Sequence, residues 1–258
     1  MPTTLNITSP VTLVGNGRSG TSLVSKAFNN HPDCRYHGET VNLIHSVWYS
    51  LERNLPPMLA PKIPETIRQQ FLHLFTSDTR FWMHKPIGVP VVAAFMKDQE
   101  EYVEWFWDVL TTVFPDATFC TVVRHPLDVM VSSRDWWGRP LDGIAHSNML
   151  TAKMVMHPSS KVQFGVAYED LVADPETHIK ALITKSGLPW DEACLKPVQE
   201  LHSSTRTEHS TDPASFHRRD QWADIPPEII TPEYREAVGR YWEYYAGRPL
   251  DWGPFGDD

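Results

Sequence analysis

Residues 15–22 (GNGRSGTS) have the types and the spacing that bind an anion. They match the nucleotide-binding pattern GxxxxGK(S/T) except at Thr21, which stands in the place of the lysine. A short apolar run, residues 11–15, precedes the loop and a segment with helical spacing follows it, which indicates a strand, a loop and a helix. Backbone N–H groups and the helix dipole then point at the anion, and Arg18 adds a positive charge.

The missing lysine changes which nucleotide the loop suits. That lysine normally reaches the β- and γ-phosphates of a triphosphate. With Thr21 in its place, the loop suits a donor whose 5′ end carries one phosphate and one further group. A simple glycine turn between a strand and a helix is the alternative interpretation of so short a motif.

A second group of polar residues follows another apolar run. Residues 118–123 (TFCTVV) predict a strand that is buried on both faces. Arg124 comes directly after it, and Ser132 lies two turns into the helix expected to begin at Pro126. Ligands of open parallel sheets bind beyond the carboxyl ends of the strands, so Arg124 and the glycine loop are expected at one edge. Two anion-binding corners suggest a nucleotide phosphorylated at two places.

The remaining periodicity predicts an α/β domain, with a central parallel sheet flanked by helices. A third strand is expected at residues 162–168, followed by a helix capped by Asp174. Residues 1–258 are predicted to form a single domain, with a flexible flap at about 200–230. The other segments with helical spacing are residues 64–75, 98–114 and 234–245.

Composition limits the partners. A formal net charge of −9 argues against duplex nucleic acid and against a polyanionic glycan. The three cysteines are too far apart for a disulfide framework or a zinc site, so no metal is expected and a reducing cytoplasm is the predicted location. No apolar run approaches the roughly 20 residues that span a bilayer, so no membrane insertion is expected, and the first residues do not resemble a secretion signal. No oligomeric state is predicted.

Taken in order, these motifs resemble the sulfotransferase family, and in particular the branch of tyrosylprotein, carbohydrate and many bacterial sulfotransferases. GRSGTS resembles the family's 5′-phosphosulfate loop and VVRHPLDVMVSS its 3′-phosphate segment. HPDCRYHGET is similar to the stretch that carries the branch's catalytic glutamate, and WMHKP to its lysine segment. The later similarities are FPDATF, YEDLVADPE and GLPW, so the resemblance runs from residue 11 to about 230.

The resemblance implies a P-loop, nucleotide-kinase-like fold and a metal-independent reaction. The sulfonyl group of 3′-phosphoadenosine 5′-phosphosulfate (PAPS) would move to a hydroxyl of a small-molecule, sugar or acyl-linked acceptor, leaving adenosine 3′,5′-bisphosphate. Gln221 departs from the family, which often has a lysine or arginine beside the tryptophan, and this leaves open whether Arg218, Arg219 or neither closes over the donor. The residues implied to bind the donor are Arg18, Ser19, Gly20, Thr21, Ser22, Arg124 and Ser132, with Tyr168, Ser204 and Arg219 near the nucleotide.

The reaction needs a base for the acceptor proton and cations for the departing phosphate. Glu39, in the family-like HGET segment, is the predicted base, and Lys85 and Arg18 are predicted to stabilise the leaving group. His37 is a competing base, because histidine titrates near neutral pH. His84, beside Lys85, is a third candidate.

Aromatic residues near these motifs could form an acceptor pocket. They occur in residues 45–59, in Phe81–Trp82 and in Trp136–Trp137, and packing in the core is the alternative for each. Two other functions stay open: a P-loop kinase or NTPase, and a PAPS-binding protein without turnover. The kinase predicts a lysine after Gly20 and an acidic residue at a strand end for Mg²⁺.

Overall fold

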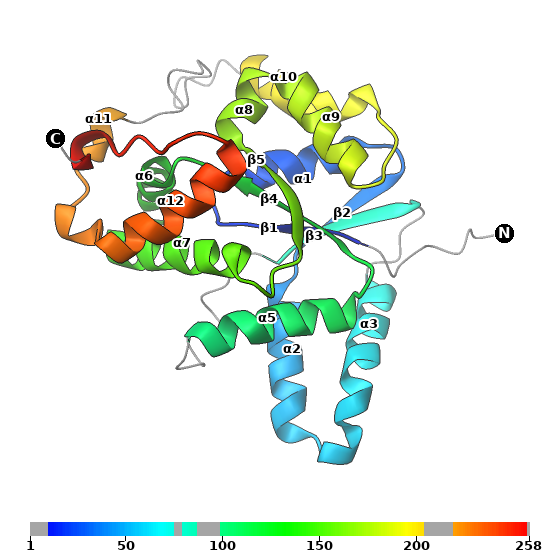
Figure 1. Ribbon diagram of the computed structural model, residues 1–258. Coiled ribbons are helices and arrows are strands. Elements are labelled where there is room, and N and C mark those ends of the chain that lie inside the picture. The colour runs from blue at the N-terminus through cyan, green and yellow to red at the C-terminus, as the bar shows by residue number, and fades with distance from the viewer. Residues whose placement is uncertain (1–9, 75–78, 87–98, 204–218, 257–258) are drawn as a thin grey trace.

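Five parallel strands form the centre of the computed structural model (Figure 1). The structure describes residues 10–74, 79–86, 99–203 and 219–256. The order of the strands across the sheet is β2-β3-β1-β4-β5, so β1 is central and β2 and β5 form the edges. The strands are β1 (Val11–Val14), β2 (Cys34–Glu39), β3 (Phe81–Lys85), β4 (Thr118–Val123) and β5 (Val162–Ala167).

Helices cover both faces of the sheet (Figure 1). On one face lie α1 (Thr21–Asn30), α9 (Pro175–Lys185) and α10 (Lys196–Ser203), and the short α8 (Tyr168–Ala173) follows β5 directly. The helices on the other face are α5 (Gln99–Val113), α6 (Pro126–Trp137), α7 (Leu141–Met156), α11 (Arg219–Trp222) and α12 (Pro232–Ala246). This arrangement confirms the predicted α/β domain.

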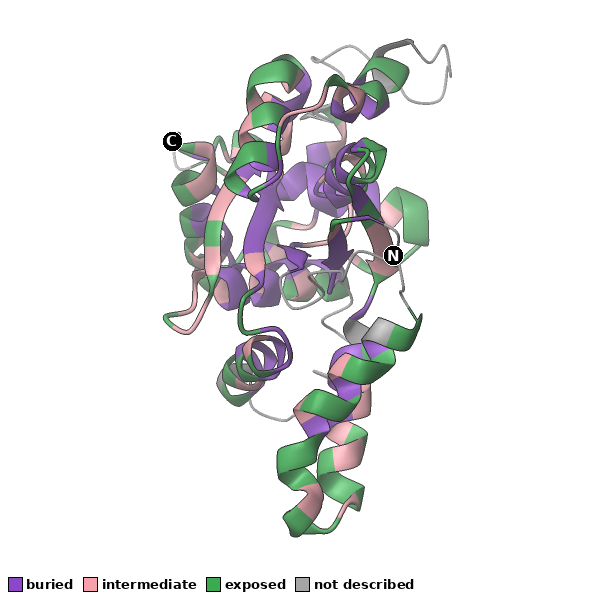
Figure 2. Ribbon diagram, turned by 90° about the vertical axis from the view of Figure 1, so that its right-hand side faces the viewer, coloured by how far each residue is buried: buried purple, intermediate pink, exposed green. Residues whose placement is uncertain are grey.

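Two helices form a hairpin that projects from the sheet. They are α2 (Val41–Asn54) and α3 (Ile63–Leu74), joined by a 3₁₀ turn at Pro57–Lys62. Exposed residues predominate at the far end of this hairpin (Figure 2). Its near end is anchored in the core by side chains such as Ile44 and Ile67, both fully buried.

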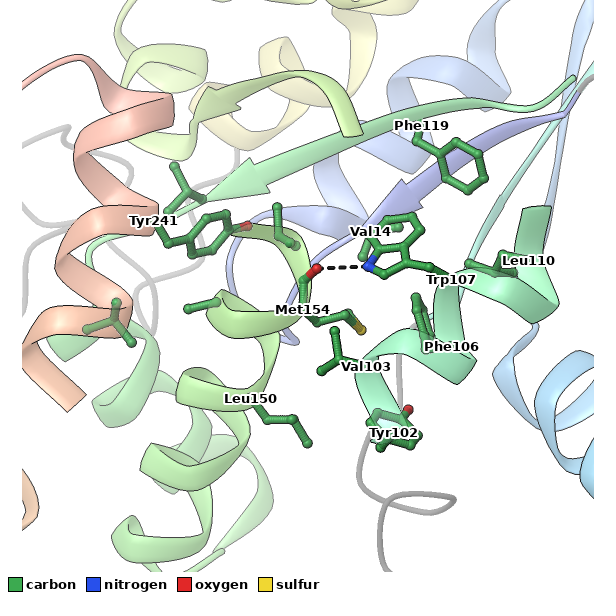
Figure 3. Close-up of a cluster of buried hydrophobic side chains, with 14 of the residues drawn as sticks. Val14, Tyr102, Val103, Phe106, Trp107, Leu110, Phe119, Leu150, Met154 and Tyr241 are labelled. Carbon is green, nitrogen blue, oxygen red and sulfur yellow. Dashed lines mark hydrogen bonds between the residues drawn. The ribbon is translucent and has the colours of Figure 1, made fainter. Parts of the chain in front are cut away.

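The core on the face of the sheet that α5, α7 and α12 cover is rich in aromatic side chains (Figure 3). Trp107 of α5 is fully buried there, and its indole N–H donates a hydrogen bond of 2.8 Å to the carbonyl of Met154 on α7. The bond satisfies the one polar atom of a large side chain that would otherwise lose its water without compensation. Trp107 therefore ties α5 to α7 as well as filling the core.

Most of the predicted elements are confirmed, with corrections at their ends. The segment predicted at 64–75 is α3, and the Asp174 carboxylate caps α9 by accepting from the Thr177 N–H. The strand predicted at 162–168 ends at Ala167, because Tyr168 begins α8. The predicted flap at about 200–230 is helical at residues 200–203, which end α10, and at residues 219–222, which form α11. Residues 204–218 fall outside the described residues.

None of the helices in the described part of the chain combines the length and the apolar character that crossing a membrane requires.

Trp107→Ala should lower the free energy of unfolding by about 3–5 kcal/mol, because it removes a fully buried aromatic ring. Denaturant unfolding followed by circular dichroism measures the change. Met58→Ala is the control: this side chain, 81% exposed in the hairpin turn, should change stability by less than about 0.5 kcal/mol. Equal losses in the two variants would contradict the assignment of Trp107 to the core.

Candidate active site

Each strand of the sheet either ends at a residue that the sequence analysis singled out or is followed directly by one. β2 ends at Glu39, β3 at Lys85, and β1 runs into the glycine loop. β4 and β5 are followed directly by Arg124 and Tyr168. Because all five strands are parallel, these residues lie along one edge of the sheet, where open α/β sheets bind their ligands.

The glycine loop has a backbone shape that depends on its glycines. Gly20 has a φ of 98° at the start of α1, and a Cβ added there would overlap the ring of Tyr168. Arg18 also has a positive φ, of 67°, which is uncommon for a residue with a side chain. Ser19 stabilises the turn, since its hydroxyl donates a 2.6 Å bond to the carbonyl of Asn16. Thr21 is buried, with its methyl group facing Gly15.

Contacts with Asn148, Tyr234 and Trp137 support this loop, and of these three the sequence singled out only Trp137, as a possible acceptor-pocket residue. The amide of Asn16 donates to the side-chain oxygen of Asn148 on α7. The amide of Asn148 donates in turn to the Tyr234 hydroxyl on α12, at 3.3 Å. Trp137 packs so closely on Gly17 that a Cβ at Gly17 would overlap its ring. No local sequence pattern predicts these contacts, because the partners are far apart along the chain.

The two predicted anion-binding corners are joined into one site. Arg18 Nε donates to the Ser132 hydroxyl at 3.2 Å, and Arg124 Nη1 donates to the carbonyl of Arg18, also at 3.2 Å. The Arg124 guanidinium lies 4.9 Å from the centre of the Tyr168 ring, and burial raises the pKa of that phenol, so it stays neutral. The ring of Trp136 lies 4.6 Å from the Arg18 guanidinium.

Lys85 connects Glu39, the predicted base, to the glycine loop. Its ammonium nitrogen lies 3.3 Å from a carboxylate oxygen of Glu39 and 3.4 Å from the hydroxyl oxygen of Ser22. The Lys85 side chain is 6% exposed, whereas that of Glu39 is 57% exposed, so the carboxylate faces solvent and the ammonium does not. A register shift between Tyr36 and Glu39, with Gly38 at a φ of 82°, brings Glu39 opposite Lys85. Glu39 is therefore the last residue of an edge strand.

The two histidines considered as bases differ in their surroundings. His37 is half-buried, its ring centre is 5.9 Å from that of Trp82, and burial lowers its pKa below the usual value. His84 is fully buried, and both of its ring nitrogens are hydrogen-bonded, to the hydroxyls of Thr12 and Thr40. His84 therefore has no ring nitrogen available to a substrate.

Trp222 fixes the end of α11 next to the Arg124 segment. Its ring stacks on His125 at a centre-to-centre distance of 4.5 Å, and its indole N–H donates to the buried carboxylate of Asp128 at 2.8 Å. His125 Nε2 donates to the carbonyl of Asp251, which draws the C-terminal segment into the same cluster. Arg219 begins α11, but its side chain, like Ser204 as a whole, lies outside the described residues.

The described residues contain no group of three His, Cys, Asp or Glu side chains placed to hold a metal ion.

A strand, a glycine loop and a helix at the carboxyl edge of a parallel sheet make this a P-loop-like α/β protein. Such helix N-termini suit anions in general. The profile of the sulfotransferase family matches residues 10–192, which is more than half of the chain. The chain belongs to the sulfotransferase family.

Two sulfotransferase domains are among the solved structures that share its fold. The sulfotransferase domain of the Synechococcus PCC 7002 olefin synthase has 17% sequence identity and a TM-score of 0.58, over 93% of this chain and 97% of that domain. The sulfotransferase domain from the curacin biosynthetic pathway has 14% identity and a TM-score of 0.57, over 92% of this chain and 98% of that domain. No curated protein sequence is a significant match to the chain.

Gly20→Ala should lower the free energy of unfolding by about 1–3 kcal/mol, because alanine is strained at this φ and its methyl group displaces the Tyr168 ring. The matched control is Gly143→Ala in α7, where a Cβ meets nothing within 4 Å. That change should be neutral or stabilise by up to about 1 kcal/mol. Denaturant unfolding of both variants tests the assignment, which equal stabilities would contradict.

Proposed function

We propose that the protein transfers the sulfonyl group of PAPS to a hydroxyl of an uncharged acceptor. The observation that carries the proposal is the position of the Lys85 ammonium, which contacts both Glu39 and Ser22. One cation thus connects the proposed base with the loop proposed to hold the reacting end of the donor. An in-line transfer needs these groups next to each other.

The fit of the donor to the described residues supports the proposal. The 5′-phosphosulfate would lie on residues 18–22 at the N-terminus of α1, where backbone N–H groups suit an anion and Thr21 and Ser22 would add hydroxyl donors. The 3′-phosphate would bind Arg124 and Ser132, which the Arg18 contacts bring to the same loop. Tyr168 covers Gly20 and would lie beside the nucleotide. Ser204 and Arg219 stay proposals from the resemblance.

Glu39 is the proposed general base. It is exposed to an incoming acceptor, and it is the carboxylate that Lys85 contacts. His37 is the weaker alternative: its ring lies against Trp82, in the core on the face opposite α1, whereas Lys85 contacts Ser22 at the start of α1. A lowered pKa keeps His37 neutral at pH 7, so it retains the capacity to accept a proton.

The proposed step balances without a further reactant. Glu39 takes the acceptor's hydroxyl proton as the acceptor oxygen forms a bond to sulfur. The bond between sulfur and the bridging oxygen of the 5′-phosphate breaks, and its electron pair leaves with that oxygen, which gives adenosine 3′,5′-bisphosphate. Lys85 and Arg18 stabilise the charge that develops on the departing phosphate.

Exposed aromatic rings support an uncharged acceptor such as a sugar, an alcohol or an acyl-linked hydroxy compound. Trp136, which is 61% exposed, and its neighbour Trp137 flank the glycine loop and offer apolar surface beside it. Trp82 and Trp48 are buried in the core, so the core-packing alternative holds for these two. The acceptor surface is therefore proposed at the end of α6.

Adenosine 3′,5′-bisphosphate should raise the melting temperature of the protein, whereas ATP with Mg²⁺ should not, because the loop lacks the lysine that a triphosphate needs.

Arg124→Ala should weaken bisphosphate binding by about tenfold to a hundredfold, the value of a charge-assisted contact. Calorimetric titration measures it, with exposed Arg240→Ala on α12 as the control. Stabilisation by ATP with Mg²⁺ alone would favour a kinase, and unchanged affinity in Arg124→Ala would remove the 3′-phosphate assignment.

Glu39→Gln should lower PAPS turnover by about a hundredfold or more and leave bisphosphate affinity nearly unchanged, because the base acts on the acceptor and not on the nucleotide. Turnover is followed with radiolabelled PAPS against a panel of hydroxyl acceptors. His37→Gln is the matched comparison and should retain most activity. The reverse result, with His37→Gln inactive and Glu39→Gln active, would assign the base to His37. Bisphosphate binding without turnover by the wild type on any acceptor would indicate a binding protein.

A further inference from the structure

His84 is a buried polar residue in an otherwise aromatic environment. The rings of Phe71, Trp82 and Phe114 surround it, with centre-to-centre distances of 6.2, 5.2 and 5.6 Å. Burial, with smaller contributions from His45 and His37, lowers the pKa of His84 to about 3, so the ring is neutral at physiological pH. A neutral imidazole has one N–H donor and one acceptor nitrogen.

Both nitrogens are engaged, and they connect three strands. Nε2 lies 2.7 Å from the hydroxyl oxygen of Thr12 on β1, and Nδ1 lies 2.7 Å from that of Thr40, which follows β2. Thr12, His84 and Thr40 are all buried. Since one nitrogen donates and the other accepts, the three side chains form a directional chain of hydrogen bonds across β1, β3 and the end of β2.

Thr40 uses its hydroxyl in this link and not for helix capping. It occupies the N-cap of α2, where a threonine hydroxyl usually accepts from an N–H of the first turn, yet it makes no such bond. Its backbone N–H donates to the carbonyl of Lys85 at 3.3 Å. The residue after Glu39 is thus held to β3 twice, through the carbonyl of Lys85 and through the side chain of His84.

The end of β2 needs such an anchor. The ladder between β2 and β3 shifts register between Tyr36 and Glu39, so the pairing of Glu39 with Lys85 does not simply continue the pairing of Cys34–Tyr36. Successive residues of a strand point to opposite faces. Lys85 therefore reaches Glu39 and Ser22 from one face of β3, while His84 holds Thr40 from the other.

We propose that His84 is a positioning residue: the Thr12–His84–Thr40 link holds Glu39 against Lys85 and so against the donor loop. The inference rests on the proposed function for its catalytic consequence, but the contact itself can be tested in the free protein. It assigns to His84 a role other than proton transfer to substrate.

The test replaces each threonine hydroxyl by a methyl group. In Thr40→Val and Thr12→Val, the Lys85 ammonium signal in ¹H–¹⁵N spectra of the free protein should move toward its position in Glu39→Gln. Thr40→Ser keeps the hydroxyl and should keep the wild-type signal. Thr121→Val is the matched control, because its buried hydroxyl bonds to the Tyr241 hydroxyl at 2.6 Å, away from Glu39. Lys85→Met assigns the signal by its absence.

Turnover of radiolabelled PAPS should fall by about tenfold to a hundredfold in the two valine variants of the link, as expected for a misplaced catalytic group, with affinity for adenosine 3′,5′-bisphosphate unchanged. Thr40→Ser should restore turnover. An unmoved Lys85 signal in Thr40→Val would overturn the positioning role, as would parallel losses of affinity and turnover that Thr40→Ser does not restore. A wild type that fails to bind the bisphosphate would refute the proposed function, and the Lys85 signal would still decide the role of His84.

Discussion

The contact of one buried ammonium with a carboxylate and a hydroxyl holds the proposed site together. Lys85 brings together Glu39 from the edge strand β2 and Ser22 from the helix after the central strand β1. This contact is possible because β3 lies between β1 and β2 and all three run in the same direction. Strand order therefore determines which site residues can touch, and an antiparallel neighbour would carry its terminal residue to the far edge.

The fold class and the anion loop were predictable because their signals are local. A strand, a glycine turn and a helix follow one another in residues 11–30, and β4 is a run of β-branched and aromatic residues that Arg124 follows directly. β2 and β3 were not predicted as strands. β2 reads CRYHGE, which is polar and only partly buried at the edge of the sheet, and β3 has five residues with a histidine and a lysine among them. Neither has the alternation or the apolar run that indicates a strand.

The sequence placed Arg124 and the glycine loop at one edge of the sheet, but it had no signal for most individual side-chain contacts between distant segments. The ring of Trp222 and the carboxylate of Asp128 are 94 positions apart, and Asn16 and Asn148 are 132 apart. His84 shows the limit most clearly: its residue type and its place beside Lys85 favoured a base, and only its two threonine partners reveal that both nitrogens are already used. Residue type indicates the chemistry available to a side chain, but burial and partners decide whether a substrate can reach it.

The cluster around Trp222 has a consequence for the limits of the domain. The family profile ends at residue 192, yet the ring of Trp222 lies between His125 and Gly253, and the carbonyl of Asp251 accepts from His125. A fragment cut at the profile boundary would leave His125 and Asp128, next to the proposed phosphate ligand Arg124, without these partners. A unit that keeps these contacts with the Arg124 segment therefore extends to about residue 255, well beyond the end of the profile.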